Sequence, residues 1–297
     1  MSEANATVLP SAPAAGRRKL VVRLVRFAKS KPLGMAGAAA VIFVIAVAVC
    51  APLLTPYDPL KLDMPRAFTP PGYQHLLGTD NFGRDVLSRI IWGARVSLSV
   101  SLLSVLLGDV IGAVLGLASG YFGGKFDIIL QRFFDSLSAF PSLILALTVV
   151  AVLGPSLYNV VLAIAVTRMP FVGRVMRASA LRIKEFQFVE AAKAVGCKDN
   201  WILLVHIFPN ALAPLIIVSS GGLATAILVE GTLSFMGVGL PPPTPSWGAM
   251  LAGSGQQYVT KAPWMAIAPG AAIVLPVFGF NMLGDALRDV LDPRLRR

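Results

Sequence analysis

The sequence predicts an all-α integral membrane protein with six transmembrane helices, and two observations lead to that fold class. Of the 297 residues, 56% are hydrophobic and 14% are charged, and the mean hydropathy is +0.73. Soluble domains carry about 25% charged residues. The apolar residues are also gathered in runs of about 20, which is the length that a helix needs to cross a bilayer core of about 30 Å.

Five apolar runs stand out along the chain, and one of them needs a decision. They cover residues 33–54, 96–117, 137–167, 212–235 and 264–284. The third run is long and contains Gly154-Pro155, a pair that is typical of turns. It fits either one tilted helix over 141–167 or two helices over roughly 133–153 and 156–174.

The first run follows a basic tail, so a cleaved signal peptide is an alternative to a membrane span. The run over 33–54 is longer than the apolar region of a signal peptide and ends without a small-x-small cleavage site. We therefore expect an uncleaved first span.

The positions of Lys and Arg decide between five spans and six. Basic residues concentrate on the cytoplasmic side of membrane proteins. The tail over 1–32, which we expect to be disordered, holds seven of them, and residues 168–198 hold another seven. A single span over 141–167 would place the second group outside. Six spans place 20 of the 26 basic residues inside and both termini in the cytoplasm.

This choice gives the domain organisation. We expect a cytoplasmic tail over 1–32, a first span over 33–54, an outer segment over 55–94, a core of five spans over 95–290 with a cytoplasmic loop over 182–209, and a cytoplasmic tail over 291–297.

The sequence lacks the motifs of the common membrane enzymes. It has no H-E-x-x-H and no G-x-S-x-G, and His75 and His206 stand alone, so we expect no catalytic residue and no metal site. Gly124-Lys125 is followed by Phe126 and is not a phosphate loop. The chain therefore cannot bind ATP through a phosphate loop, and if transport is driven by ATP, the ATPase is another polypeptide. The net charge of +11 lies beside apolar spans, so no nucleic-acid partner is expected.

The sequence of the cytoplasmic loop predicts a helix, a turn and a second helix. Residues 185–195 are good helix formers, and Gly196 is placed to end the helix with a positive φ. An apolar run over 201–208 then ends at Pro209. Ala191 and Ala192 leave one helix face nearly flat, which suits a groove on a soluble partner. Trp201 and Ile202 are expected to pack against the ends of the spans.

Three stretches carry a resemblance to a known family. "EAAKAVG" followed by "HIFP" resembles the EAA loop of permease subunits of binding-protein-dependent ABC importers. Glu190, Ala191, Ala192, Gly196 and Pro209 match the family pattern, whereas His206 and Phe208 stand at its usual Ile and Leu. "LLGTDNFGRDVLSRIIWGARVSL" and "LSFMGVGLPPPTPSWGAML" look like the dipeptide/oligopeptide/nickel branch, and the likeness covers most of residues 25–297.

The resemblance implies a type I ABC importer permease fold in the bacterial inner membrane, surrounded by lipid, with the outer segment in the periplasm. It implies a second permease subunit in a heterodimer, two ATPase subunits that hold ATP and Mg, and a periplasmic binding protein. The five matching residues would then couple the permease to its ATPases. The implied cargo is a di- or oligopeptide, with nickel or glutathione as alternatives. A channel or scaffold protein without an ATPase is the alternative from another class.

Two acidic residues and a glycine stripe remain within the spans. Asp109 and Glu230 would cost roughly 2.5–3.5 kcal/mol each if they faced lipid, so we expect them to face protein or a watery cavity. A place on the transport pathway and a packing role both stay open. Arg168 is expected to reach the inner membrane surface. Small residues at fourfold spacing predict close helix packing, and they are Gly108, Gly112, Gly116 and Gly120.

Overall fold

The structure is a computed structural model that describes residues 31–252 and 258–291. Within these residues it contains helices and no strand, which confirms the all-α prediction. The N-terminal tail, which we predicted to be disordered, consists mostly of residues 1–30. The C-terminal tail consists mostly of residues 292–297. Both ranges lie outside the described residues.

Five helices are long and apolar enough to cross a membrane on their own. They are α2 (Pro32–Val49), α4 (Val86–Phe122), α7 (Leu157–Ile183), α10 (Phe208–Phe235) together with the turns before it, and α13 (Trp264–Leu291). Two more, α5 (Gly124–Ser138) and α6 (Ser142–Leu153), pass the same test only as a pair. Counting this pair as one broken span gives six within the described residues, as the sequence predicts.

The third span is not the continuous helix that we expected over 133–153. α5 and α6 meet at an angle of 89°. Pro141 stands directly before α6, where it lacks an N–H and disfavours helical geometry for Phe140. α5 is held along α7 by its polar face, because Arg177 donates to Asp127 at 2.6 Å. The break predicted at Gly154 is confirmed, since α6 ends there with a φ of 86°.

Helix ends also differ from the apolar runs. The first run breaks at Cys50, after which α3 (Ala51–Leu54) follows. α4 begins at Val86, well before residue 96, and the Asp85 side chain caps it by accepting from the Ser88 N–H at 2.7 Å. α7 and α13 run past residues 174 and 284. Hydropathy cannot find such ends, because they are polar where a helix extends beyond the apolar layer.

The glycine stripe packs α4 against α7, as predicted. A Cβ on each glycine would meet a backbone carbonyl of α7. The facing pairs are Gly108 with Ala165, Gly112 with Met169, Gly116 with Gly173, and Gly120 with Arg177. Both helices advance by four residues per pair, so the two backbones stay in contact along most of their length.

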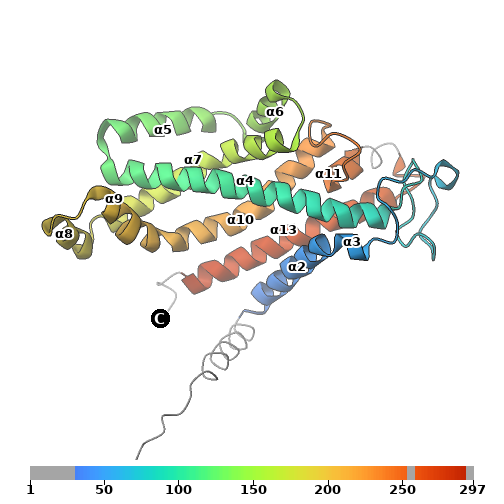
Figure 1. Ribbon diagram of the computed structural model, residues 1–297, viewed down its shortest axis with the longest axis horizontal. Helices are drawn as coiled ribbons and strands as arrows, with labels where there is room; N and C mark the ends of the chain where they lie inside the picture. Colours follow the sequence, from blue (N-terminus) through green and yellow to red (C-terminus); the bar gives the residue numbers. More distant parts are fainter. Residues whose placement is uncertain (1–30, 253–257, 292–297) are drawn as a thin grey trace, which may run out of the picture.

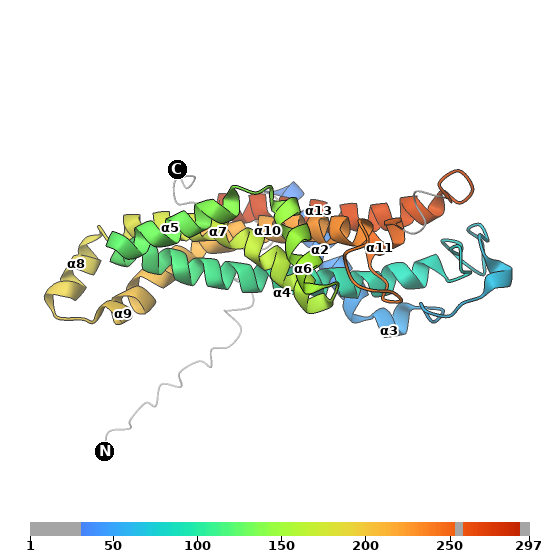
Figure 2. The ribbon, with the colours of Figure 1, turned by 90° about the horizontal axis from the view of Figure 1, so that it is seen from above.

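The long helices pack along one another: α4 contacts α7, α10 and α2, and α13 contacts α10 and α2 (Figure 1). Figure 2 shows the bundle as a shallow layer with α8 (Gln187–Ala194) at one end and residues 55–85, with the short turn η1 (Met64–Arg66), at the other. α2 runs toward residues 55–85. Its first turn lies beside the end of α13, where Lys31 pairs with Asp289. Because residues 55–85 lie opposite α8, the start of α2 and the neighbouring end of α13 both lie toward α8.

Candidate functional site

The loop that matches the EAA pattern projects from one end of the bundle as a short helix with a defined stop (Figure 1). α8 ends at Ala194, and Gly196 follows with a φ of 83°. The Gly196 N–H donates to the Lys193 carbonyl, and the Cys197 N–H donates to the Ala192 carbonyl, each at 3.0 Å. These two bonds form a Schellman motif, in which glycine is favoured at the residue of positive φ. The predicted helix stop is confirmed.

The two faces of α8 have different surroundings. Val189 and Ala192 are buried in a cluster formed with the ends of α4, α7 and α10, whereas Glu190 and Ala191 are exposed. Residues three apart share a helix face, which explains why Ala192 follows Val189 inward. The expectation that both alanines form one exposed face is therefore wrong for Ala192. The surface open to a partner contains Glu190 and Ala191.

The second half of the loop does not end at Pro209. The turn α9 (Asp199–Trp201) continues through a π-helix, η2 (Ile202–Ile207), directly into α10. Pro209 lies exposed where the π-helix passes into α10, and its missing N–H removes one bond from the continuous helix. A proline crowds the carbonyl four residues before it, and the wider π turn lies at that point, with the Phe208 N–H donating to the Leu203 carbonyl.

The expected packing role of Trp201 and Ile202 holds for one of them. Ile202 is fully buried in the same cluster as Val189, but Trp201 is 58% exposed. Adjacent residues of a helix point about 100° apart, so both could not face the bundle. Trp201 is thus a second exposed feature of the loop.

Polar contacts fasten the loop to the end of α4. The Tyr121 hydroxyl donates to Asp199, and the Lys193 ammonium lies 5.3 Å from the centre of the Tyr121 ring. The Lys184 ammonium donates to the Gly120 carbonyl at 3.2 Å. Tyr121 was not predicted from the sequence. Together with the buried cluster, these contacts attach the loop that contains α8 to the bundle.

Asp109 lies at the centre of the bundle, in a buried ion pair. Arg168 donates to its carboxylate from Nε at 3.0 Å and from Nη2 at 2.7 and 2.9 Å. The Ser219 hydroxyl donates to the same carboxylate at 2.7 Å. The cluster joins α4, α7 and α10. The expectation that Arg168 reaches the inner membrane surface is wrong, because a fixed carboxylate on the neighbouring helix holds the guanidinium within the bundle.

A cavity of about 380 Å³ lies beside this pair, between α7 and α10. Its wall is mostly apolar, and Arg168 is the charged residue in it. Polar atoms come also from the hydroxyls of Ser142, Thr167 and Thr225. Asp109 does not line the cavity, but it holds the residue that does.

Glu230 is fully buried in α10, which confirms that it faces protein. The Ser234 hydroxyl donates to Oε1 at 2.8 Å. Oε2 has no hydrogen-bond partner among the described residues, and the same holds for the buried hydroxyls of Ser97 and Ser101 on α4. Unlike Arg168, Glu230 does not line the cavity between α7 and α10.

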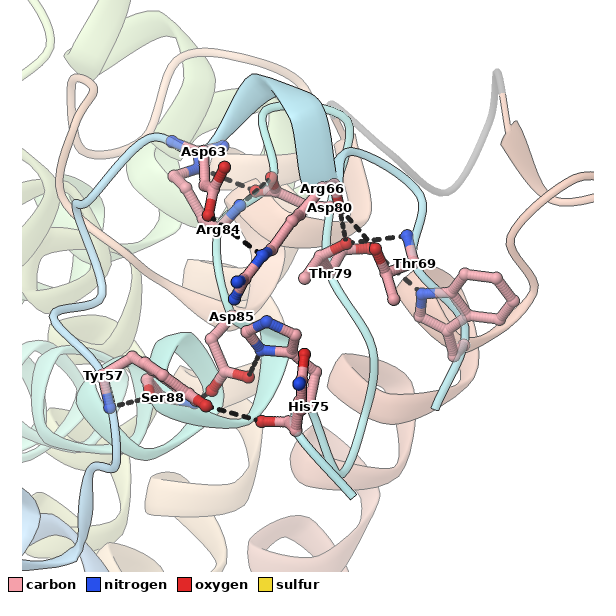
Figure 3. Close-up of polar contacts among 12 residues, drawn as sticks. Tyr57, Asp63, Arg66, Thr69, His75, Thr79, Asp80, Arg84, Asp85 and Ser88 are labelled. Atoms are coloured by element: carbon pink, nitrogen blue, oxygen red, sulfur yellow. Dashed lines mark hydrogen bonds and ion pairs between the residues drawn. The ribbon is translucent and has the colours of Figure 1, made fainter. Parts of the chain in front are cut away.

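The opposite end of the molecule carries a second polar network, drawn in Figure 3. His75, which looks isolated in the sequence, is buried with its Nδ1 at 2.9 Å from Asp85, the residue that caps α4. Arg84 donates to Asp80 at 2.7 Å. The Tyr57 N–H donates to the Ser88 hydroxyl at 3.2 Å. These bonds fold residues 55–85 back onto the start of α4.

Comparison with protein families finds two matches. Residues 112–297 match the family described as the inner membrane component of binding-protein-dependent transport systems. Residues 23–71 match the N-terminal transmembrane domain of oligopeptide transport permease C.

Named relatives match over nearly the whole chain. A dipeptide transport system permease protein of Alkalihalophilus pseudofirmus is 42% identical over 90% of this chain and 88% of its own length. A probable D,D-dipeptide transport system permease protein of Escherichia coli K12 is 39% identical over 92% and 91%. A glutathione transport system permease protein of Escherichia coli is 40% identical over 89% and 87%.

Solved structures give the fold. The MetNI methionine ABC transporter in an inward-facing conformation matches with a TM-score of 0.56 and 19% identity over 69% of this chain and 97% of that one. An amino acid ABC transporter matches with a TM-score of 0.51 and 17% identity over 67% and 92%. The likeness supports a type I importer permease fold. The chain therefore belongs to the family of inner membrane components of binding-protein-dependent ABC importers, within its dipeptide and oligopeptide permease branch.

Proposed function

We propose that this chain forms half of the translocation pathway of an ATP-driven importer for di- or oligopeptides. A second permease subunit forms the other half, two ATPase subunits bind the cytoplasmic loops, and a periplasmic binding protein delivers the cargo. The observation that carries the proposal is the exposed α8 at one end of the bundle, in a chain of this family.

The coupling step rests on how α8 is attached. Its exposed side, with Glu190 and Ala191, docks in a groove of an ATPase subunit. Its buried side shares one apolar cluster with α4, α7 and α10. When bound ATP closes the two ATPases, each α8 moves with its groove, and the packed cluster moves the helix ends. The pathway then changes from inward-facing to outward-facing by rigid-body rocking.

The orientation follows from charge. α8 and both ends of the described chain lie toward one end of the bundle, and the basic residues of the sequence are concentrated on the corresponding segments. That end is the cytoplasmic one in the inner membrane. Residues 55–85 then face the periplasm, where the binding protein docks. ATP and Mg are held by the ATPase subunits, and this chain needs no cofactor of its own.

The names of the relatives support a peptide cargo. Two are named for dipeptides, and one is named for glutathione, which is itself a short peptide. Glutathione is therefore the second candidate within the same chemical class. The binding protein that delivers the cargo selects among such peptides.

Coupling is tested by changing the α8 turn in the assembled importer. Gly196→Val should abolish ATP-driven peptide uptake in proteoliposomes, because a branched side chain disfavours the positive φ by about 1–2 kcal/mol or more. Glu190→Lys places the opposite charge at the groove. Both variants should reach the membrane in normal amounts, yet they should retain less ATPase in a pull-down or hydrolyse ATP without uptake.

Matched variants separate coupling from general damage. Nothing lies within 4 Å of a Cβ at Gly196, so Gly196→Asn, which tolerates positive φ, should transport normally. Glu190→Gln keeps the size of the side chain and should lose less than Glu190→Lys. Full peptide uptake by a chain that carries both Gly196→Val and Glu190→Lys would contradict the coupling role of α8. A wild-type chain that purifies without any ATPase points to a channel or scaffold instead.

A further inference from the structure

The cavity between α7 and α10 has the features of a ligand site. Its volume of about 380 Å³ falls within the roughly 300–1,000 Å³ of small-molecule sites, which are mostly apolar with a few placed polar groups. The placed groups here are the Arg168 guanidinium and hydroxyls such as those of Thr167 and Thr225. Arg168 lies near the middle of α7, so the cavity lies about halfway through the bundle.

The guanidinium has one edge that the protein does not use. An arginine carries five N–H donors in a planar fork. Nε and Nη2 donate to Asp109. Within residues 31–252 and 258–291, Nη1 donates to no protein acceptor, and it is not among the enclosed polar atoms that lack a partner. The Nη1 edge is therefore left for a group that enters the cavity.

The absence of a side chain at Gly222 allows the Arg168 guanidinium to lie where it does. A Cβ at Gly222 would overlap Nη2, Cζ and Nη1 of Arg168. Because glycine has none, the guanidinium lies directly against the backbone of α10, and it lines the cavity together with Gly221 and Gly222.

We propose that the cavity binds the C-terminal carboxylate of the transported peptide through the Nη1 edge of Arg168, while Asp109 and Ser219 hold the guanidinium in place. The inference rests on the proposed function and names the contact that a peptide makes inside this chain. A carboxylate on a guanidinium forms charge-assisted hydrogen bonds of defined geometry. The apolar wall receives the rest of the peptide, and the second permease subunit closes the cavity.

The pairing with Asp109 keeps this contact weak enough for transport. A lone buried guanidinium would hold a carboxylate tightly and stop the cargo there. Asp109 already neutralises the charge of Arg168, so the cargo carboxylate on the Nη1 edge is attracted less strongly and can leave again. Conduction requires binding that is favourable enough for entry and weak enough for exit.

The test measures which peptides cross the membrane. The complete importer is placed in proteoliposomes with saturating binding protein, and uptake of a dipeptide is compared with uptake of the same dipeptide amidated at its C-terminus. The quantity compared is the ratio of kcat/KM for the two peptides. The same binding protein is used with every variant, so a change in the ratio belongs to the permease.

Two variants remove the Nη1 edge in different ways. Asp109→Asn with Arg168→Gln removes both charges but keeps a hydrogen-bonding pair. Arg168→Lys keeps the charge pair and loses the fork. For each, the ratio should fall about tenfold, which matches the loss of one charge-assisted hydrogen bond. The control is Asp135→Asn with Arg174→Gln, an exposed ion pair whose arginine also lies on α7. Its ratio of kcat/KM for the two peptides should stay at the wild-type value.

The outcomes are distinct. An unchanged ratio in Arg168→Lys, or in the double variant, overturns the carboxylate site while peptide import stands. A wild-type importer that moves neither peptide with ATP overturns the proposed function, and the carboxylate site with it. A double variant that does not accumulate leaves Arg168→Lys to decide.

Discussion

At the scale of single residues, the buried charges are explained by their partners. Asp109 and Arg168 are placed on different helices, and each would be costly alone in an apolar interior. The pairing turns two unfavourable residues into one neutral unit and leaves one edge of Arg168 for the cavity. Among the described residues Glu230 has no basic partner of this kind, and the Ser234 hydroxyl donates a hydrogen bond to it.

Breaking this pair from one side should be more harmful than removing it. Asp109→Leu leaves the Arg168 charge buried, and we expect a loss of about 3–5 kcal/mol in the free energy of unfolding. Asp109→Leu with Arg168→Met should recover most of that loss. Thermal unfolding of the detergent-solubilised protein measures both. Asp135→Leu, at the exposed pair with Arg174, serves as control and should cost about 0–1 kcal/mol. Wild-type unfolding of Asp109→Leu would contradict the buried-pair account.

At the scale of elements, glycine has two different structural roles. The stripe on α4 brings two helix backbones together, while Gly196 ends α8 with a turn that few other residues adopt. The first acts through space, because a Cβ would strike the backbone of α7. The second acts through backbone conformation, because the space around Gly196 is open.

The stripe predicts a position-specific cost for alanine. Gly116→Ala places a methyl group against the backbone of Gly173, so the helices must separate, and we expect a loss of about 1–3 kcal/mol in the free energy of unfolding. Gly270→Ala in α13 meets nothing within 4 Å and should be neutral or stabilising by up to about 1 kcal/mol. Thermal unfolding of the two variants compares them, and equal stabilities would argue against the stripe as the contact that sets the α4–α7 distance.

At the scale of the whole molecule, the bundle separates two groups of structural features that lie at its opposite ends. α8 and its exposed neighbour Trp201 lie at one end, and residues 55–85 with their buried polar network lie at the other (Figure 2). The Asp109–Arg168 pair lies between them. A chain arranged in this way can receive cargo at one end and a mechanical input at the other.

The orientation of these ends is open to direct test. Alkaline phosphatase needs the oxidising periplasm to form its disulfides and become active. Fused after residue 200, beside α8, it should be inactive. Fused after residue 250, at the end of α11 (Trp247–Met250), it should be active. The reverse pattern would invert the proposed topology and remove α8 from the compartment where ATP is hydrolysed.

Much of this molecule could be predicted from local pattern. Apolar runs predicted the five long membrane helices, and a sixth span when the bent pair α5 and α6 is counted as one, because hydropathy depends on composition along a segment. The helix stop at Gly196 and the packing of the glycine stripe were also predicted, because each follows from residue type and spacing. The EAA stretch pointed to the family for a similar reason, since its five residues lie within one loop.

The tertiary structure decided what depends on which residues meet. Composition indicated that Asp109 faces protein, yet its partner Arg168 is separated from it by 59 residues, and the sequence placed that arginine at the membrane surface instead. The burial of Ala192, the exposure of Trp201 and the bond between His75 and Asp85 depend in the same way on neighbours from other elements. Hydropathy averages over a window along the chain. Burial, pairing and cavities are set by contacts between segments that are far apart in sequence, so only the packed bundle determines them.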